Sequence, residues 1–168
     1  MVTAEHVGRY KQDGFYWAHA ADAVAITPKN AWAALERLLT DTLRRVPTIS
    51  NRPIEVLRTG TGGSLLGVGA QLRTRAKVLA VIGVPMRLTV IAVQPGRYVR
   101  IAVNKNFADI DFRIDADNDE CVLTYRQGFQ QGTLLGWIGA NLTFGIREVP
   151  ETAAILNTWV QTATATHG

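Results

Sequence analysis

The sequence predicts an α+β domain in which a curved antiparallel sheet of about seven strands wraps around a long C-terminal helix, with two short helices after the first strand. Apolar and polar residues alternate through most of residues 52–130, as in half-buried antiparallel strands. Residues 27–39 and 133–163 carry apolar residues at helical spacing instead. A curved sheet exposes an apolar concave face, and the C-terminal helix is the one predicted element long enough to cover it.

The first strand is expected within residues 14–26, which are rich in aromatic and β-branched residues. A helix is predicted over residues 28–39, because Thr27 is a favoured N-cap residue and Pro28 occupies the favoured first position. A second short helix is predicted over residues 41–46.

The strands that follow are predicted within residues 54–60, 68–78, 86–93, 98–106, 107–115 and 121–130. The clearest alternation places Ala108, Ile110, Phe112 and Ile114 on one face and Asp109, Asp111, Arg113 and Asp115 on the other. Acidic residues opposite basic strands predict an exposed cross-strand charge pattern rather than a catalytic pair or a cation site.

No charged side chain occurs from Gly128 through Ile146. Polar residues interrupt this run, and its helical part, residues 133–146, is shorter than the roughly 20 apolar residues of a membrane-spanning helix. We therefore expect a covering helix and no stable membrane insertion. Pro150 is expected to kink or restart this helix, which continues to residue 163.

The chain of 168 residues is expected to form a single domain over residues 1–168, with residues 1–13 as a flexible N-terminal segment. The net charge of +4 is scattered, and no basic run is interleaved with aromatic residues, so nucleic-acid binding is not expected. Cys121 is the only cysteine, and the N-terminus lacks the apolar core of a signal peptide. A cytoplasmic location is the expectation that follows.

Together these elements resemble the helix-grip superfamily, which includes START domains, polyketide cyclase/dehydratase-like proteins and the major birch pollen allergen. The segments that carry the resemblance are AVAITPKNAWAAL, GVGAQLRTRAKV, PGRYVRIAV, FRIDADNDECVLTYRQGF and the closing helix. The resemblance spans about residues 15–163 and implies a cavity between the sheet and the long helix. It also implies an apolar or amphipathic ligand such as a lipid, sterol or polyketide. Most members bind or carry ligands, and a minority catalyse cyclisation or dehydration.

Candidate ligand-binding residues lie on two of the predicted elements. Trp137, Asn141 and Phe144 share one arc of the C-terminal helix and would line the pocket if that arc faces the sheet. The alternative is that the two aromatic residues fill the core. Tyr125 and Phe129 share one face of the last strand, which suits either a cavity wall or an ordinary strand.

Three functions stay open at this point. The first is binding or carriage of a hydrophobic small molecule, without a cofactor. The second is a cyclase/dehydratase-type enzyme in which Tyr125 or Asn141 polarises a carbonyl, and the third is a protein-interaction module with a filled cavity. The histidines at 6, 19 and 167 adjoin no recognisable nucleophile motif, so no catalytic residue is assigned. No histidine and cysteine spacing suits a metal.

Overall fold

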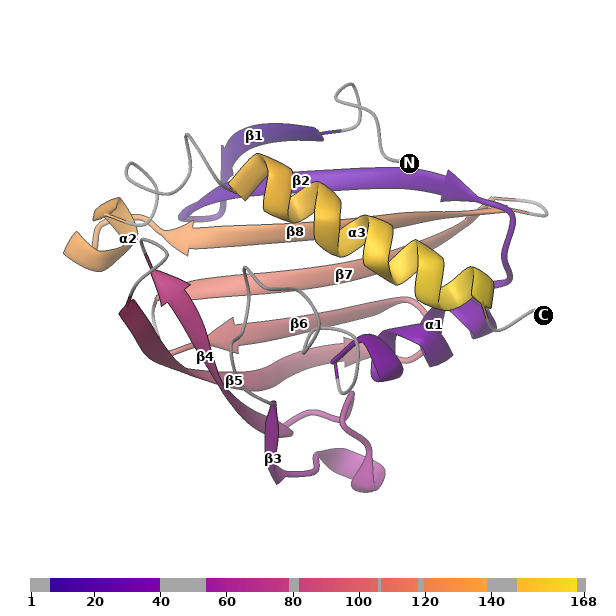
Figure 1. Cartoon of the computed structure of the whole chain (residues 1–168), viewed down its shortest axis with the longest axis horizontal. Coiled ribbons are helices and arrows are strands. Elements are labelled where there is room, and N and C mark those ends of the chain that lie inside the picture. The colour runs from indigo at the N-terminus through magenta and orange to yellow at the C-terminus, as the bar shows by residue number, and fades with distance from the viewer. Residues whose placement is uncertain are drawn as a thin grey trace.

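A computed structural model of the chain describes residues 7–39, 54–78, 82–105, 107–117, 120–138 and 148–165. Within them, eight antiparallel strands form one sheet in the order β1-β2-β8-β7-β6-β5-β4-β3 (Figure 1). The strands are β1 (Val7–Gln12), β2 (Phe15–Val24), β3 (Glu55–Arg58), β4 (Gln71–Val78), β5 (Ile82–Gln94), β6 (Tyr98–Val103), β7 (Ala108–Asp117) and β8 (Glu120–Gln130). The helices are α1 (Pro28–Arg37), α2 (Leu134–Ile138) and α3 (Glu148–Thr164), with a 3-10 turn at Thr61–Gly63.

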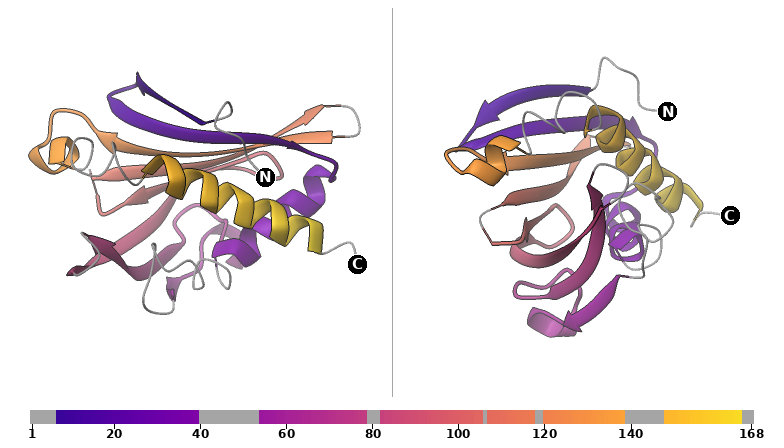
Figure 2. Two further views of the ribbon diagram at one scale, coloured as in Figure 1. Left: turned by 45° about the horizontal axis from the view of Figure 1, so that its top comes forward. Right: turned by 60° about the vertical axis from the view of Figure 1, so that its left-hand side comes forward.

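The sheet curves around α3, and α1 lies beside that helix on the same face (Figure 2). α3 packs against β2, β8 and α1. Trp159 of α3 is fully buried, and its indole N–H donates a hydrogen bond of 2.9 Å to the carbonyl of Ala31 in α1. The predicted α+β fold, a curved antiparallel sheet with a C-terminal helix in its concavity, is confirmed.

Strand β1 is the main departure from prediction at the N-terminal end. Residues 7–12 were expected to be flexible, but they pair with β2 from Val7↔Ala20 to Gln12↔Phe15. The turn between the strands is Asp13–Gly14, and both residues have positive φ, 51° and 78°. An Asp-Gly pair of this kind is typical of tight hairpin turns, so the local signal for β1 was present in the turn rather than in the strand.

Helix α1 begins as predicted. The Thr27 hydroxyl accepts a hydrogen bond from the Asn30 amide at 3.4 Å, and Pro28 opens the helix. The second short helix, predicted over residues 41–46, lies outside the described residues.

The C-terminal region differs from the predicted covering helix. α2 lies beyond the end of β8 and exposes Leu134 and Trp137, while α3 covers the concave face. The expectation that the helix starting near residue 133 lies over the sheet is therefore wrong for residues 134–138. Pro150 lies in the first turn of α3, where its missing N–H costs no helical hydrogen bond, as expected for a restarted helix.

Gly136 allows α2 to fold back on the end of β8. A Cβ at this position would lie 1.8 Å from the carbonyl oxygen of Gln130, and the Gly136 amide donates to the Thr133 hydroxyl at 2.9 Å. Gly136→Ala is expected to lower the free energy of unfolding by about 2 kcal/mol, because this backbone must move. Urea denaturation measures the change.

Gly132→Ala is the matched control for this prediction. Its φ of 78° is unfavourable for alanine, but its Cβ would meet nothing within 4 Å. It should cost only about 1 kcal/mol, the backbone contribution. An equal or smaller cost for Gly136→Ala would show that α2 does not depend on this close approach.

Candidate functional site

The concave face of the sheet is largely apolar. Alternate residues of β7 and β8 point toward it: Ala108, Ile110, Phe112 and Ile114 on β7, and Cys121, Leu123, Tyr125, Gln127 and Phe129 on β8. The alternation predicted for residues 108–115 is therefore confirmed on its apolar side, with Ala108, Phe112 and Ile114 buried.

One half of this face is closed by α3. The ring of Trp159 meets Phe112 edge-on, with 5.4 Å between ring centroids, and Phe112 in turn lies 5.0 Å from the ring of Tyr125. All three side chains are almost completely buried. This half is a packed core.

Of the described helices, α1 and α3 cover the other half, toward α2, only in part. Ile110 and Gln127 are register partners there, and both are half-buried. Tyr16, Met86 and Phe107 are also half-buried against the core. We call these five residues the open concave surface.

A polar pair lies where the packed half of the face meets the open concave surface. The Tyr125 hydroxyl donates a hydrogen bond of 3.0 Å to the side-chain oxygen of Gln127. Tyr125 is 1% exposed and belongs to the packed half, whereas its partner Gln127 is half-buried and belongs to the open concave surface. A bound molecule could exchange hydrogen bonds with this pair while its apolar part contacts Ile110.

The predicted site residues are distributed over three places. Tyr125 and Phe129 lie on the concave face, and their assignment to ligand binding remains a prediction. Trp137 lies on α2 and is 56% exposed, away from the packed core. Asn141 and Phe144 lie outside the described residues. Ile110, which is half-buried, was predicted to face inward but was not proposed as a site residue. Alternation along a strand shows which face a residue lies on, but not which part of that face a helix covers.

Solved structures match this arrangement, although no protein-family model and no curated protein matches the chain. A point mutant of norcoclaurine synthase from Thalictrum flavum, in complex with a transition state analogue, has a TM-score of 0.66 at 13% identity, over 94% of this chain and all of that one. Ara h 8.0201 gives 0.60 at 10% identity, over 90% of this chain and 99% of its own. TTHA0849 from Thermus thermophilus gives 0.63 at 10% identity, with the same coverage of 90% and 99%.

The chain has the helix-grip fold. At such identities the likeness shows the fold alone, and the helix-grip fold hosts more than one kind of function. None of the described helices is long and apolar enough to cross a membrane.

Cys121 lies deep in the helix-grip core. Its thiol donates a hydrogen bond of 3.1 Å to the carbonyl of Ile26, and burial raises the pKa of the thiol above its ordinary value. A buried thiol of raised pKa is a poor nucleophile. The cysteine is therefore part of the packing.

The outer face of the helix-grip sheet corrects one prediction. Asp109 and Asp111 were expected in an exposed charge pattern, but they are 8% and 1% exposed. Arg100 pairs with Asp109 at 2.5 Å, and Arg126 pairs with Asp111. The strands bring these residues together because Asp111 lies between Arg100 and Arg126 in the register of β6, β7 and β8.

Trp17 explains why these charges are buried. It lies on the outer face of β2, only 1% exposed, opposite Gly128 of β8. The Arg126 guanidinium lies 4.3 Å from the centre of its ring, and the Arg100 guanidinium lies 5.7 Å away. The indole and the two guanidinium groups together shield the carboxylates from solvent.

Asp111 bears the electrostatic cost of this burial. Desolvation raises the pKa of its carboxyl group above the ordinary value, while Arg126 and Arg100 act in the opposite direction. Its Oδ1 atom has no hydrogen-bond partner among the described residues. Asp111 also lines a cavity of about 110 Å³ on this face.

His19 is the one described histidine, and it too lies on the outer face. It alternates with Ala18 and Ala20, which are fully buried in the core, and its ring contacts Tyr10 at 5.3 Å. Burial lowers the pKa of the imidazole. Because it lies on the opposite side of the sheet, it cannot serve as a base for a molecule bound on the concave face.

Proposed function

We propose that the chain binds an apolar or amphipathic small molecule, such as a lipid, sterol or polyketide-like compound, on the concave face between the sheet and α3. The observation that carries this proposal is the open concave surface, where a hydrogen-bonded Tyr125–Gln127 pair lies within apolar surroundings. Covering this apolar surface would contribute about 25 cal/mol per Å² of buried area. The polar pair would orient one polar group of the ligand.

Solved structures with the same fold are consistent with the proposal, although the proposal rests on the open concave surface. Norcoclaurine synthase from Thalictrum flavum, which shares the fold, has been solved in complex with dopamine and hydroxybenzaldehyde, with a TM-score of 0.63 at 12% identity. That fold therefore accommodates small aromatic molecules in at least one protein.

Filling the open concave surface should weaken ligand binding. Ile110→Trp places a large side chain over Gln127, the register partner of Ile110, so a ligand would meet an occupied surface. We expect affinity for a fluorescent fatty acid to fall about tenfold or more. Titration of probe fluorescence measures it, and native mass spectrometry of the purified protein shows whether a natural ligand is retained.

Ile91→Trp is the control, because it adds the same side chain at an exposed position of β5. Unchanged affinity in Ile110→Trp would place the ligand elsewhere. A wild-type protein that binds no apolar probe would favour the interaction module instead.

A second candidate function is catalysis of the cyclase/dehydratase kind. The Tyr125 hydroxyl favours it, because a phenol that donates to Gln127 can donate instead to the carbonyl oxygen of a bound substrate. Tyr125→Phe distinguishes the two candidates. An enzyme would lose turnover while it still binds substrate, whereas a carrier would show no turnover in either form.

A further inference from the structure

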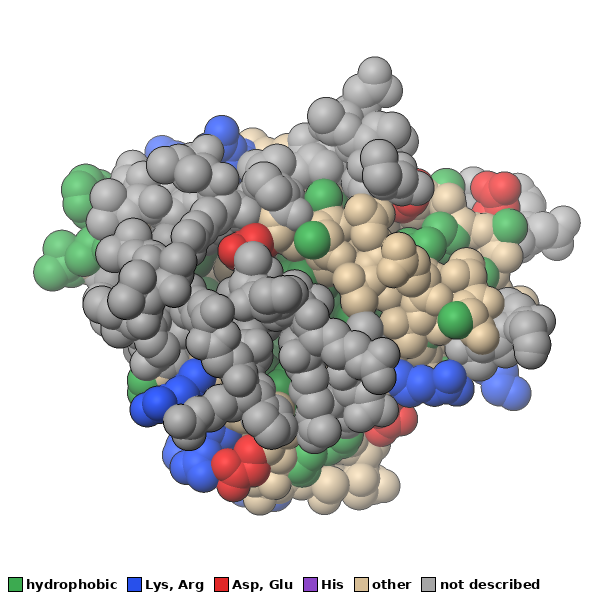
Figure 3. All heavy atoms as spheres, viewed as in Figure 1, with side chains coloured by type: hydrophobic (Ala, Val, Ile, Leu, Met, Phe, Trp, Pro, Cys, Tyr) green, Lys and Arg blue, Asp and Glu red, His purple; other side chains and the backbone are tan. Residues whose placement is uncertain are grey.

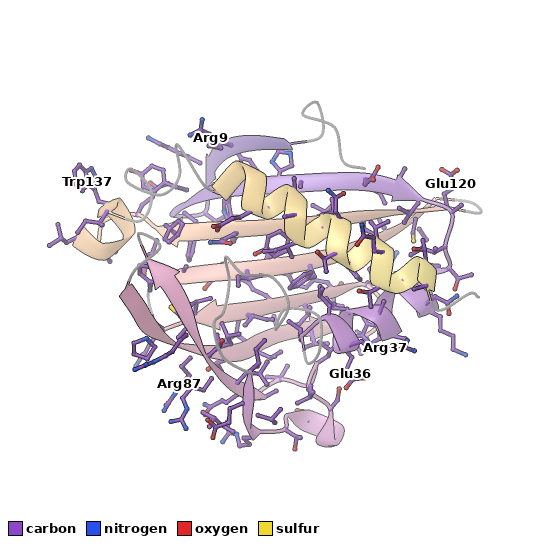
Figure 4. The ribbon with its side chains drawn as sticks, viewed as in Figure 1. Arg9, Glu36, Arg37, Arg87, Glu120 and Trp137 are labelled. Atoms are coloured by element: carbon purple, nitrogen blue, oxygen red, sulfur yellow. The ribbon has the colours of Figure 1, made fainter. Side chains whose placement is uncertain are left out.

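α2 presents two large apolar side chains to solvent. Leu134 is 74% exposed and Trp137 is 56% exposed, on a helix of five residues. Figure 4 shows Trp137 at one end of the molecule, pointing away from the sheet. Exposed apolar residues gathered at one tip commonly mark an interaction surface.

Several turns meet at this end of the sheet. The Gln131 amide, just before α2, donates a hydrogen bond of 2.7 Å to the carbonyl of Gly14 in the β1–β2 turn. The Gln130 amide donates to the Phe107 carbonyl at 3.1 Å, which brings in the β6–β7 turn. The Asn104 amide donates to the Arg87 carbonyl at 2.8 Å, so this part of β5 lies there too.

The charges at this end are mainly positive. Lys11, Arg87 and Lys105 are exposed around these turns, whereas Asp13 is the one acidic residue in them among the described residues. In Figure 3 the apolar side chains of α2 protrude at the left edge, with basic side chains above and below them. The opposite end of the long axis carries the β7–β8 hairpin with the exposed acidic residue Glu120, which Figure 4 labels far from Trp137.

We propose that the α2 end of the molecule docks on the surface of an anionic lipid bilayer. Leu134 and Trp137 would enter the headgroup region, where an indole ring is favourably placed because it is both apolar and a hydrogen-bond donor. Lys11, Arg87 and Lys105 would lie against the anionic headgroups. The acidic hairpin at the far end would point away from the membrane, which agrees with the orientation set by Leu134 and Trp137.

This docking is independent of ligand binding, but its geometry suits the proposed function. The open concave surface lies on the α2 side of Trp159, since Gln127 and Phe129 follow Tyr125 along β8 toward α2. A docked molecule would therefore hold this surface close to the lipid. Flotation with vesicles tests docking even if no ligand is ever found.

The experiment uses the whole protein and two kinds of vesicle, phosphatidylcholine alone and phosphatidylcholine mixed with phosphatidylserine. We expect binding to the mixed vesicles only, weakened by salt. The double variant Leu134→Ser/Trp137→Ser should bind about tenfold more weakly, because its apolar tip is lost. Lys105→Glu should weaken binding by a similar factor.

Two matched variants serve as controls. Ile91→Ser removes an apolar side chain that is 45% exposed elsewhere, and Lys29→Glu makes the same charge change on α1, away from α2. Both should bind like the wild type. Trp137→Phe should abolish the blue shift of tryptophan emission that accompanies docking.

Three outcomes would overturn the proposal. The first is no binding to the mixed vesicles at low salt, and the second is equal binding by the double variant and the wild type. The third is a wild-type dimer that becomes a monomer in the double variant and binds no vesicles, since the α2 tip would then be a contact between two copies of the chain.

Discussion

Gly128→Ala is expected to lower the free energy of unfolding by about 2–4 kcal/mol. A Cβ at Gly128 would lie 2.5 Å from the Cε3 atom of Trp17. The indole cannot move away easily, because it is 1% exposed, lies against Phe15 and Arg126, and donates a hydrogen bond of 3.1 Å to the Gln12 carbonyl. Urea denaturation followed by far-ultraviolet circular dichroism measures the loss.

A double-mutant cycle identifies the cause of that loss. In a Trp17→Leu background the clash is relieved, so Gly128→Ala should cost less than about 1 kcal/mol. The same cost in both backgrounds would mean that the glycine is needed for its backbone and not for the approach of the indole.

Asp111→Ala is expected to destabilise the protein by about 3–5 kcal/mol, because it leaves the guanidinium group of Arg126 without its carboxylate. Arg126 keeps the Tyr10 hydroxyl, to which it donates a hydrogen bond of 3.1 Å, but this neutral partner does not balance its charge. Asp111→Asn should cost less, since the amide oxygen still accepts from Arg126. Urea denaturation at neutral pH compares the two variants, and equal costs would show that the acceptor atom contributes nothing.

The pH dependence of the Asp111→Asn variant tests the balance between burial and pairing. Because burial raises the pKa of the Asp111 carboxyl, the folded state holds this proton more tightly than the unfolded state. The contribution of Asp111 is therefore fully present below its unfolded pKa and declines as pH rises through the folded pKa. As the pH falls, the free energy of unfolding of the wild type should therefore rise relative to that of Asp111→Asn. A fall relative to that variant would show that the guanidinium groups outweigh burial.

Strands β2 to β8 and α1 could be predicted from the sequence because their signals are local. Residues 108–115 alternate with period two, and the side predicted to be apolar is the buried one. Thr27 and Pro28 fix the start of α1 through contacts within one helical turn. The register of neighbouring hairpin strands then follows from the short turns between them.

The burial of Asp109 and Asp111 could not be predicted in this way. It depends on Trp17, which comes from β2, far away in sequence, and reaches this face only because β2 pairs with β8. The alternation of charged residues in the sequence is the same whether that face of the sheet is exposed to solvent or covered by an indole. Pairing of β2 with β8 is also the one connection between strands that are not consecutive in the described sheet.

The candidate site was predictable in part. Tyr125, Gln127 and Phe129 share a face because strands alternate, and the register confirms that they do. Where α3 stops covering this face depends on where α3 begins, at Glu148. Helical spacing predicted a covering helix from residue 133 onward, and it does not show that residues 134–138 lie beyond the end of β8. Trp137 is exposed because α2 lies beyond the end of β8, whereas helical spacing alone assigned it to the interior.

Among the residues that the structure describes, the sheet ends in two edge strands, β1 and β3, and both are poor templates for another chain. β1 has six residues and carries Arg9 and Lys11. β3 has four residues, all exposed, with a shift of register against β4 and a surface ion pair between Glu55 and Arg73 at 2.7 Å. Short, charged and irregular edges resist the strand-to-strand association that leads to aggregation. The described sheet can therefore keep two free edges without offering either of them as a regular template for a second chain.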